Sequence, residues 1–211
     1  MDGSYDHRVG SAEFLASTDV VDWHHPAVRT LAWLLSAGVS DPVEIAKRSF
    51  EWVRDEIRHS VDAGDTVVTC AASEVLSFRT GLCYAKSHLL AAILRANNIP
   101  AGFCYQRVSI DGVGAPFCLH GLCAVELSPR NWYRVDPRGN KPGINTKFAP
   151  PHECLAFTLQ LPGESTLPEI YAEPPSVVVK TLRRHKTMAD ACANLLDVES
   201  QWVSFRPLAA L

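Results

Sequence analysis

The sequence has no long apolar run, no marked excess of either charge and no internal repeat. Its 20 Lys and Arg residues nearly balance its 23 Asp and Glu residues, for a formal charge of −3. Because nucleic-acid-binding proteins are typically basic, and the basic residues here are scattered apart from the short run 183–186, this composition disfavours a nucleic-acid partner. No stretch is apolar for long enough to cross a bilayer, and the polar first ten residues do not resemble a signal peptide. We therefore expect no membrane association and a cytoplasmic location.

Regular cysteine spacing is also missing. The chain has seven cysteines, an odd number, without the framework of a small secreted disulfide-rich domain. We expect free thiols, six of which serve as small buried hydrophobic side chains. The seven are Cys70, Cys83, Cys104, Cys118, Cys123, Cys154 and Cys192. The remaining question is which cysteine differs from the others.

The first half of the chain has clear helix signals. With 211 residues, 47% of them hydrophobic, the chain is long enough for one core, and we expect a single domain over residues 1–211. Asp41 is followed by a proline and, at the third helical position, by an acidic residue, which together predict the start of an amphipathic helix. The preceding segment 26–37 predicts another helix, which ends at Gly38.

The pattern then changes from helices to strands. Good helix formers follow Cys83, which lies in the first turn of this helix, and Asn98 marks its end. β-branched and aromatic residues predict consecutive antiparallel strands over 103–110, 119–127 and 132–135. The proline-rich stretch 149–175 is typical of irregular structure, and 177–196 predicts a last helix. The expected fold class is α+β.

Cys83 stands where a thiol can act as a nucleophile. The unpaired N–H groups and the dipole of a first helical turn favour the thiolate, and the Cys83 N–H can donate into an oxyanion hole. A cysteine nucleophile also needs a base and a group that orients the base. His120 lies 37 positions later at the start of a predicted strand, and Asp136 lies 16 positions after it, at the end of the next. These three residues are the candidate catalytic set.

The register of the hairpin between these two strands decides whether the base and its partner meet. A turn centred on Ser128 places His120 opposite Asp136. Pairing Leu127 with Trp132 around a four-residue loop instead offsets the two by three residues. The sequence leaves both registers open.

Four features in chain order carry a family resemblance. They are Arg79-Thr-Gly-Leu-Cys83, the helix end Leu94-Arg-Ala-Asn-Asn-Ile-Pro-Ala101, His120 opening a strand, and Glu126 with Trp132 and Val135-Asp136-Pro137. In order and spacing they resemble the transglutaminase-like superfamily of cysteine enzymes, over a core of about 41–142. The resemblance implies a papain-like architecture, with the cysteine helix packed on an antiparallel sheet that bears the histidine and the aspartate. It also implies that Cys83 attacks a carbonyl, that His120 transfers the proton and that Asp136 holds the imidazole.

The chain departs from the family pattern at two positions. Asn98 stands where members often carry glycine, and both residues tolerate a positive φ at a helix end. Leu122 stands where an aromatic residue often follows the histidine, so the resemblance does not extend to the substrate subsite.

Several reactions are compatible with this set. We expect a cysteine enzyme that hydrolyses an amide or peptide bond through a thioester, acting on a peptide, a protein or a small amide. Transfer to an amine is the alternative, as in a transglutaminase or an arylamine N-acetyltransferase, of which only the latter needs acetyl-CoA. A binding module that has kept the fold without catalysis is a third reading. We expect no cofactor and no metal, and the oligomeric state stays open.

Three other features of the sequence have more ordinary explanations than a functional site. Cys118, His120 and Cys123 are metal-capable, but they lack the usual zinc-ligand spacing, and on a strand Cys123 faces the opposite side. The segment Arg58-His59-Ser60 could contribute a polar group to the cleft, but His59 is expected instead to be an exposed residue at a helix end. His88 is expected to pack on the flank of its helix. The sequence does not identify a second oxyanion donor.

Overall fold

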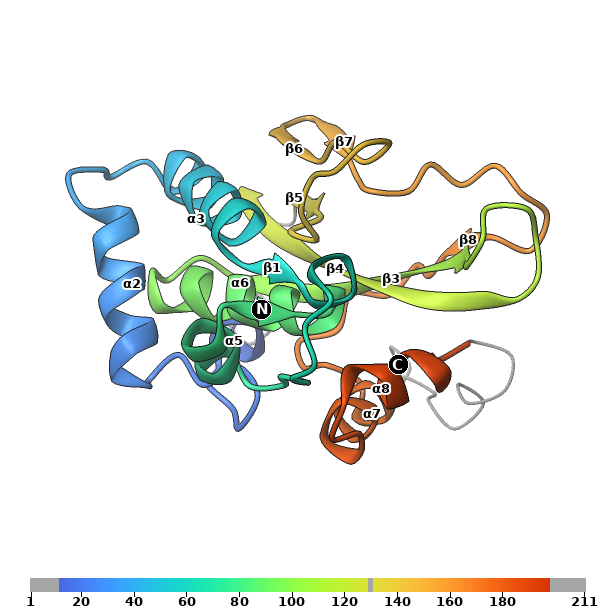
Figure 1. Ribbon diagram of the computed structural model, residues 1–211. Helices are drawn as coiled ribbons and strands as arrows, with labels where there is room; N and C mark the ends of the chain where they lie inside the picture. The colour runs from blue at the N-terminus through green and yellow to red at the C-terminus, as the bar shows by residue number, and fades with distance from the viewer. Residues whose placement is uncertain (1–11, 129–130, 198–211) are drawn as a thin grey trace, which may run out of the picture.

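The computed structural model describes residues 12–128 and 131–197, with α2 and α3 at one end and the long β3–β4 hairpin extending away from them (Figure 1). Helices come first, strands follow, and two short helices end the described chain, which confirms the α+β class. The helical elements are η1 (Glu13–Leu15), α2 (Pro26–Ser36), α3 (Pro42–Glu56), α4 (Ser60–Ala63), α5 (Ala72–Phe78), α6 (Cys83–Ala96), α7 (Ser176–Arg184) and α8 (Met188–Ala193). Within the two described ranges, no helix combines the length and apolar composition needed to cross a membrane.

The helix boundaries of the first half follow from local sequence. The Asp41 carboxylate accepts a hydrogen bond from the Val43 N–H at 3.0 Å, which caps α3 as predicted. Gly38 has φ +73° just after α2, a left-handed conformation that glycine adopts without strain. Asn98 has φ +58° after α6, so the expected end of this helix is also confirmed.

Helix α6 is the centre of the core. Every residue from Cys83 to Arg95 is buried. The helix packs against α2, α3 and α5 and also against β3 and β4. Full burial of a Leu or Ile side chain, such as Leu89, Leu90 or Ile93, stabilises a fold by about 1.5–3 kcal/mol. This packing fixes the position of Cys83 at the start of α6.

The main sheet has four antiparallel strands in the order β5-β4-β3-β8. The register of β3 and β4 runs from Ala101 opposite Val125 to Ser109 opposite Phe117. β5 pairs only with the second half of β4, from Cys123 onward. The strands are β1 (Arg58–His59), β2 (Thr80–Gly81), β3 (Ala101–Ser109), β4 (Phe117–Ser128), β5 (Asn131–Val135), β6 (Lys147–Ala149), β7 (His152–Cys154) and β8 (Ser165–Thr166).

Two predictions for the last third of the chain need correction. The stretch 149–175 is not wholly irregular, because it contains β7 and also β8, which adds to the edge of the main sheet. The expected helix over 177–196 is two helices, α7 and α8. His185 has an extended backbone after α7, and the Thr187 hydroxyl caps a new helix by accepting from the Asp190 N–H at 3.2 Å.

Candidate active site

Cys83 begins α6 just after a small parallel strand pair, which fixes the two residues that precede the N-cap. β2 pairs with β1, with Thr80 beside Arg58 and Gly81 beside His59. Leu82 is the N-cap residue and has an extended backbone, so the helix starts at Cys83. The Cys83 side chain is buried, yet it lines a cavity.

His120 and Asp136 are in direct contact. His120 Nε2 lies 2.7 Å from the Asp136 Oδ2 atom, and both side chains are buried. Neither register considered from the sequence is correct: Cys123 lies opposite Val135, and the register shifts between Glu126 and Ser128. Continued by one residue, this register places Asp136 opposite Leu122, which is two residues along β4 from His120. An offset of two keeps both side chains on one face of the sheet.

The charge on His120 is stabilised by its neighbours. Burial alone lowers the pKa of an imidazole, but the Asp136 carboxylate and Cys83 outweigh it and raise the pKa of His120 to about 10. Since Nε2 is bonded to Asp136, Nδ1 is the ring nitrogen left for the Cys83 sulfur. The arrangement favours a protonated, positively charged His120.

Asp136 is held as a carboxylate. Burial raises the pKa of a carboxyl group, but the charge and hydrogen bond of His120, with N–H donors from Ala156 at 3.0 Å and Arg138 at 3.1 Å, lower the pKa of Asp136 below its usual value. Phe157 packs edge-on against the His120 ring, with centroids 4.8 Å apart. The segment after β7 therefore fixes both members of the pair.

The cavity in front of Cys83 has a volume of about 350 Å³. One wall is β4, where the Gly121 N–H lies 3.5 Å from the Cys83 sulfur. Most of the other lining side chains are apolar. The residues that line the cavity are His59, Val61, Leu82, Cys83, Tyr84, Val108, Ser109, Ile110, Cys118, Leu119, His120, Arg138, Phe157, Cys192 and Leu195.

His59 is the residue of this cavity that the sequence interpretation assigned wrongly. It is not an exposed helix-end residue: its side chain is only 10% exposed, and β1 directs it into the cavity. Burial and the nearby Arg138 lower the pKa of His59 to about 3, although Asp62 opposes them. Its Nδ1 lies 3.5 Å from Asp62. His59 therefore adds a neutral imidazole to the site.

Lys86 connects the first turn of α6 to the end of α3. It is fully buried one turn after Cys83, and its Nζ donates to the carbonyl groups of Ile57 and, at 3.3 Å, of Arg54. Burial lowers the pKa of Lys86 to about 7, with Asp136 acting in the opposite direction. Because these carbonyls end α3, Lys86 ties α6 to the chain just before His59.

The other sequence predictions have mixed outcomes. All seven cysteines are free thiols, but Cys118, Cys154 and Cys192 are only partly buried, so the expectation of six buried ones is wrong. Within the described ranges, no group of three His, Cys, Asp or Glu side chains is arranged to hold a metal ion. His88 is buried in the helix flank as predicted, with Nδ1 2.8 Å from the Cys70 carbonyl oxygen.

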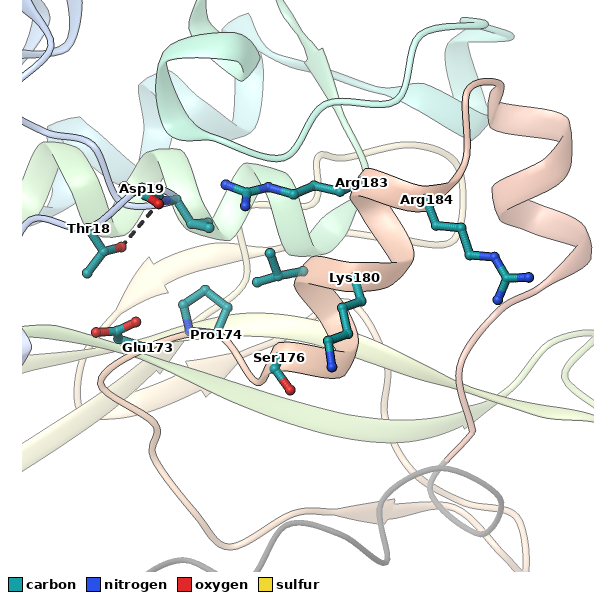
Figure 2. A pocket seen from close by; sticks show the side chains of 10 residues that line it. Thr18, Asp19, Glu173, Pro174, Ser176, Lys180, Arg183 and Arg184 are labelled. Atoms are coloured by element: carbon teal, nitrogen blue, oxygen red, sulfur yellow. Dashed lines mark hydrogen bonds between the residues drawn. The ribbon is translucent and has the colours of Figure 1, made fainter.

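A larger hollow of about 970 Å³ lies beside α7 and contains none of the candidate catalytic residues (Figure 2). Figure 2 shows Arg183 pointing toward the segment around Asp19, whereas Arg184 points away. Both arginines are exposed, and so is Lys180. The hollow is lined by Thr18, Asp19, Val20, Glu173, Pro174, Ser176, Val179, Lys180, Arg183 and Arg184. Exposed side chains of both charges do not form a site for chemistry, so the smaller cavity is the candidate active site.

Comparison of sequences gives one family match. The model of the transglutaminase-like superfamily matches residues 29–137, a range that contains Cys83, His120 and Asp136. Among curated proteins, none matches the chain.

Solved structures that resemble the chain include three of partial coverage. The structure of "a Putative Cysteine Protease from Cytophaga hutchinsonii" is 19% identical, with a TM-score of 0.51 over 65% of this chain and 43% of that chain. The periplasmic domain of TgpA from Pseudomonas aeruginosa is 19% identical, with a TM-score of 0.45 over 64% and 48%. A "putative protease" from Parabacteroides distasonis is 15% identical, with a TM-score of 0.39 over 67% and 32%. The chain spans less than half of each of these structures, and at such identities the first shows a shared fold.

Proposed function

The chain belongs to the transglutaminase-like superfamily, and on that premise we propose that Cys83, His120 and Asp136 cleave an amide or peptide bond through a thioester. The observation that carries the proposal is the 2.7 Å contact between His120 Nε2 and Asp136, made beside the cavity that Cys83 and His120 line. A nucleophile, a base and a group that orients the base are the parts that such catalysis requires.

Each group has a defined step. The Cys83 thiolate adds to the carbonyl carbon, and the His120 imidazolium gives its proton to the leaving amine as the C–N bond breaks. The neutral His120 then takes a proton from water, whose oxygen adds to the thioester. The carboxylic acid leaves and the thiolate–imidazolium pair is restored. Asp136 keeps its charge throughout and stabilises the imidazolium.

Two groups can bind the reacting oxygen. The Cys83 N–H is at the first position of α6, where an N–H has no partner within its own helix. His59 adds a neutral imidazole to the lining of the same cavity, and it can hydrogen-bond with the substrate or with the attacking water.

Hydrolysis is favoured over transfer by the charge of the cavity wall. Of the described residues that line the cavity, none is acidic, and Arg138 is cationic. A lysine side chain, which arrives as an ammonium ion and must lose a proton before it can attack, therefore has no acidic lining residue to bind it, whereas water needs none.

The proposal is tested by trapping the thioester with p-nitrophenyl acetate, a generic activated ester. We expect mass spectrometry of the acid-quenched protein to place an acetyl group on Cys83, and Cys83→Ala to abolish it. Cys118→Ala is the matched control, because this thiol lines the same cavity but is not placed beside His120 Nδ1. An acetyl group on another cysteine, or none at all, refutes the proposal.

A further inference from the structure

Among the residues that the structure describes, no strand pairs with one edge of β4 next to Cys83. β5 pairs with β4 only from Cys123 onward, so residues 117–122 extend past its end. In an antiparallel sheet, alternate residues direct their N–H and C=O groups to opposite edges. Leu119 and Gly121 are in phase with Cys123, and therefore direct theirs to the side where β5 has ended. This edge passes directly in front of the Cys83 sulfur.

The polar groups of this edge have three different partners. The Gly121 N–H lies 3.5 Å from the Cys83 sulfur, and the Leu119 carbonyl accepts from the Tyr84 hydroxyl. The Leu119 N–H donates to the carbonyl oxygen of Leu196 at 2.7 Å. The Leu119 N–H, two residues before the Gly121 N–H that faces Cys83, is thus occupied by a segment that follows α8.

That segment, residues 195–197, lies beside this edge and the cavity. Leu195 lines the cavity together with Cys83 and His120. At the other end, both Asp197 carboxylate oxygens bind Arg107 of β3, at 2.6 Å from Nε and 2.8 Å from Nη2. A main-chain hydrogen bond and an ion pair therefore help to hold the apolar Leu195 side chain in the cavity.

We propose that the Leu119–Gly121 edge of β4 binds the main chain of an extended peptide substrate, and that residues 195–197 occupy it and must leave first. The inference rests on the proposed function. Residues two apart on a strand are separated by roughly 7 Å. A peptide carbonyl bound at the Leu119 N–H therefore places the carbonyl two residues along beside the Cys83 sulfur. The site thus selects a peptide with a bulky apolar residue rather than a small amide.

Two electrophiles with the same reacting group distinguish binding of a peptide main chain from simple access of a reagent to Cys83. Benzyloxycarbonyl-Leu-Leu chloromethyl ketone carries a peptide backbone, and chloroacetone does not. We expect Asp197→Asn, which weakens the ion pair with Arg107, to speed alkylation of Cys83 by the peptidyl reagent about tenfold and by chloroacetone less than about twofold. Leu195→Ser is expected to act in the same direction. Asp190→Asn, an exposed substitution on α8, is the matched control and should change neither rate.

The inference is wrong if Asp197→Asn and Leu195→Ser leave the peptidyl rate unchanged, or accelerate both reagents equally. Neither result contradicts the proposed function as long as alkylation of Cys83 by chloroacetone still depends on His120. Loss of that dependence on His120 refutes the proposed function and this inference together.

Discussion

Cys83, His120 and His59 come from three separate elements, yet they line one cavity. Asp136 hydrogen-bonds to the His120 ring. The two histidines differ in charge: His120 is favoured as the imidazolium and His59 as the neutral imidazole. Asp136 and Cys83 favour the imidazolium of His120, whereas burial and Arg138 keep His59 neutral. Of these two histidines, only His120 is therefore expected to carry a positive charge.

Replacing His59 tests its contribution to turnover. We expect His59→Phe to slow the Cys83-dependent hydrolysis of p-nitrophenyl acetate by about 10²-fold, because the cavity loses a polar group that can bind the reacting oxygen or the water. His59→Gln keeps a donor and an acceptor and should retain most of the rate. If His59→Phe hydrolyses the ester at the original rate, His59 has no part in the reaction.

At the residue scale, the sequence predicted most of the candidate site. Chain order and side-chain chemistry selected Cys83, His120 and Asp136, and the structure brings the last two into contact; their catalytic role stays a prediction. His59 was missed because β1 and β2 are two residues each and pair in parallel, which leaves no recognisable periodicity. The only local signal was that His59 directly follows the end of a capped helix.

At the scale of elements, the site depends on how closely α6 approaches β4. Gly121 makes this approach possible, since a Cβ atom there would lie 2.6 Å from Tyr84 Cδ1 and 3.3 Å from Tyr84 Cα. The second of these atoms is backbone, which a side-chain rotation cannot move away. The distance between Cys83 and His120 is therefore set partly by the absence of a side chain at Gly121.

Gly121→Ala should separate the two elements. We expect a loss of about 1–3 kcal/mol of stability, measured by urea denaturation, together with slower alkylation of Cys83 by iodoacetamide. Asp41→Ala, which removes the α3 cap far from the contact, is expected to cost about 1 kcal/mol and to leave Cys83 reactivity unchanged. Equal reactivity in the two variants would contradict the role given to Gly121.

The elements that the sequence predicted are those with strong local signals. Capping residues and left-handed positions fixed α3 and the end of α6, whereas the hairpin register was missed because a shift between Glu126 and Ser128 leaves no mark on the strand pattern. The break between α7 and α8 was also missed. The helical pattern of 177–196 outweighed the signal from the capping residue Thr187.

At the scale of the whole molecule, the family core and the rest of the chain contribute different residues to the cavity. All three candidate catalytic residues lie within residues 29–137. Arg138, Phe157, Cys192 and Leu195, which complete the cavity wall, lie after that range. The part of the chain outside the family core is therefore expected to contribute to selectivity, together with the Leu119–Gly121 edge of β4 inside the core.

The buried neutral histidines make the whole fold sensitive to acid. The pKa of His59 is about 3 and that of His88 about 4, against about 6.5 when unfolded. Between these values the unfolded state binds more protons, so stability is lost as the pH falls from about 6.5 to 4. We expect His88 alone to contribute about 3 kcal/mol of this loss.

Urea denaturation between pH 7 and pH 4.5 measures this effect. His88→Gln should flatten the pH dependence, and the exposed His152→Gln should leave it unchanged. A free energy of unfolding that stays constant over this range would show that the two buried histidines are not coupled to folding.

The central claim is that Cys83 and His120 form a reactive ion pair, and its most direct test is site-resolved alkylation by iodoacetamide across pH, on the unmodified protein and on His120→Ala. We predict that Cys83 reacts fastest of the seven cysteines and stays reactive below pH 7, where an ordinary thiol is largely protonated. In His120→Ala this low-pH reaction should disappear. A Cys83 that is inert, or equally reactive without His120, would contradict the claim and favour a binding role for the cavity.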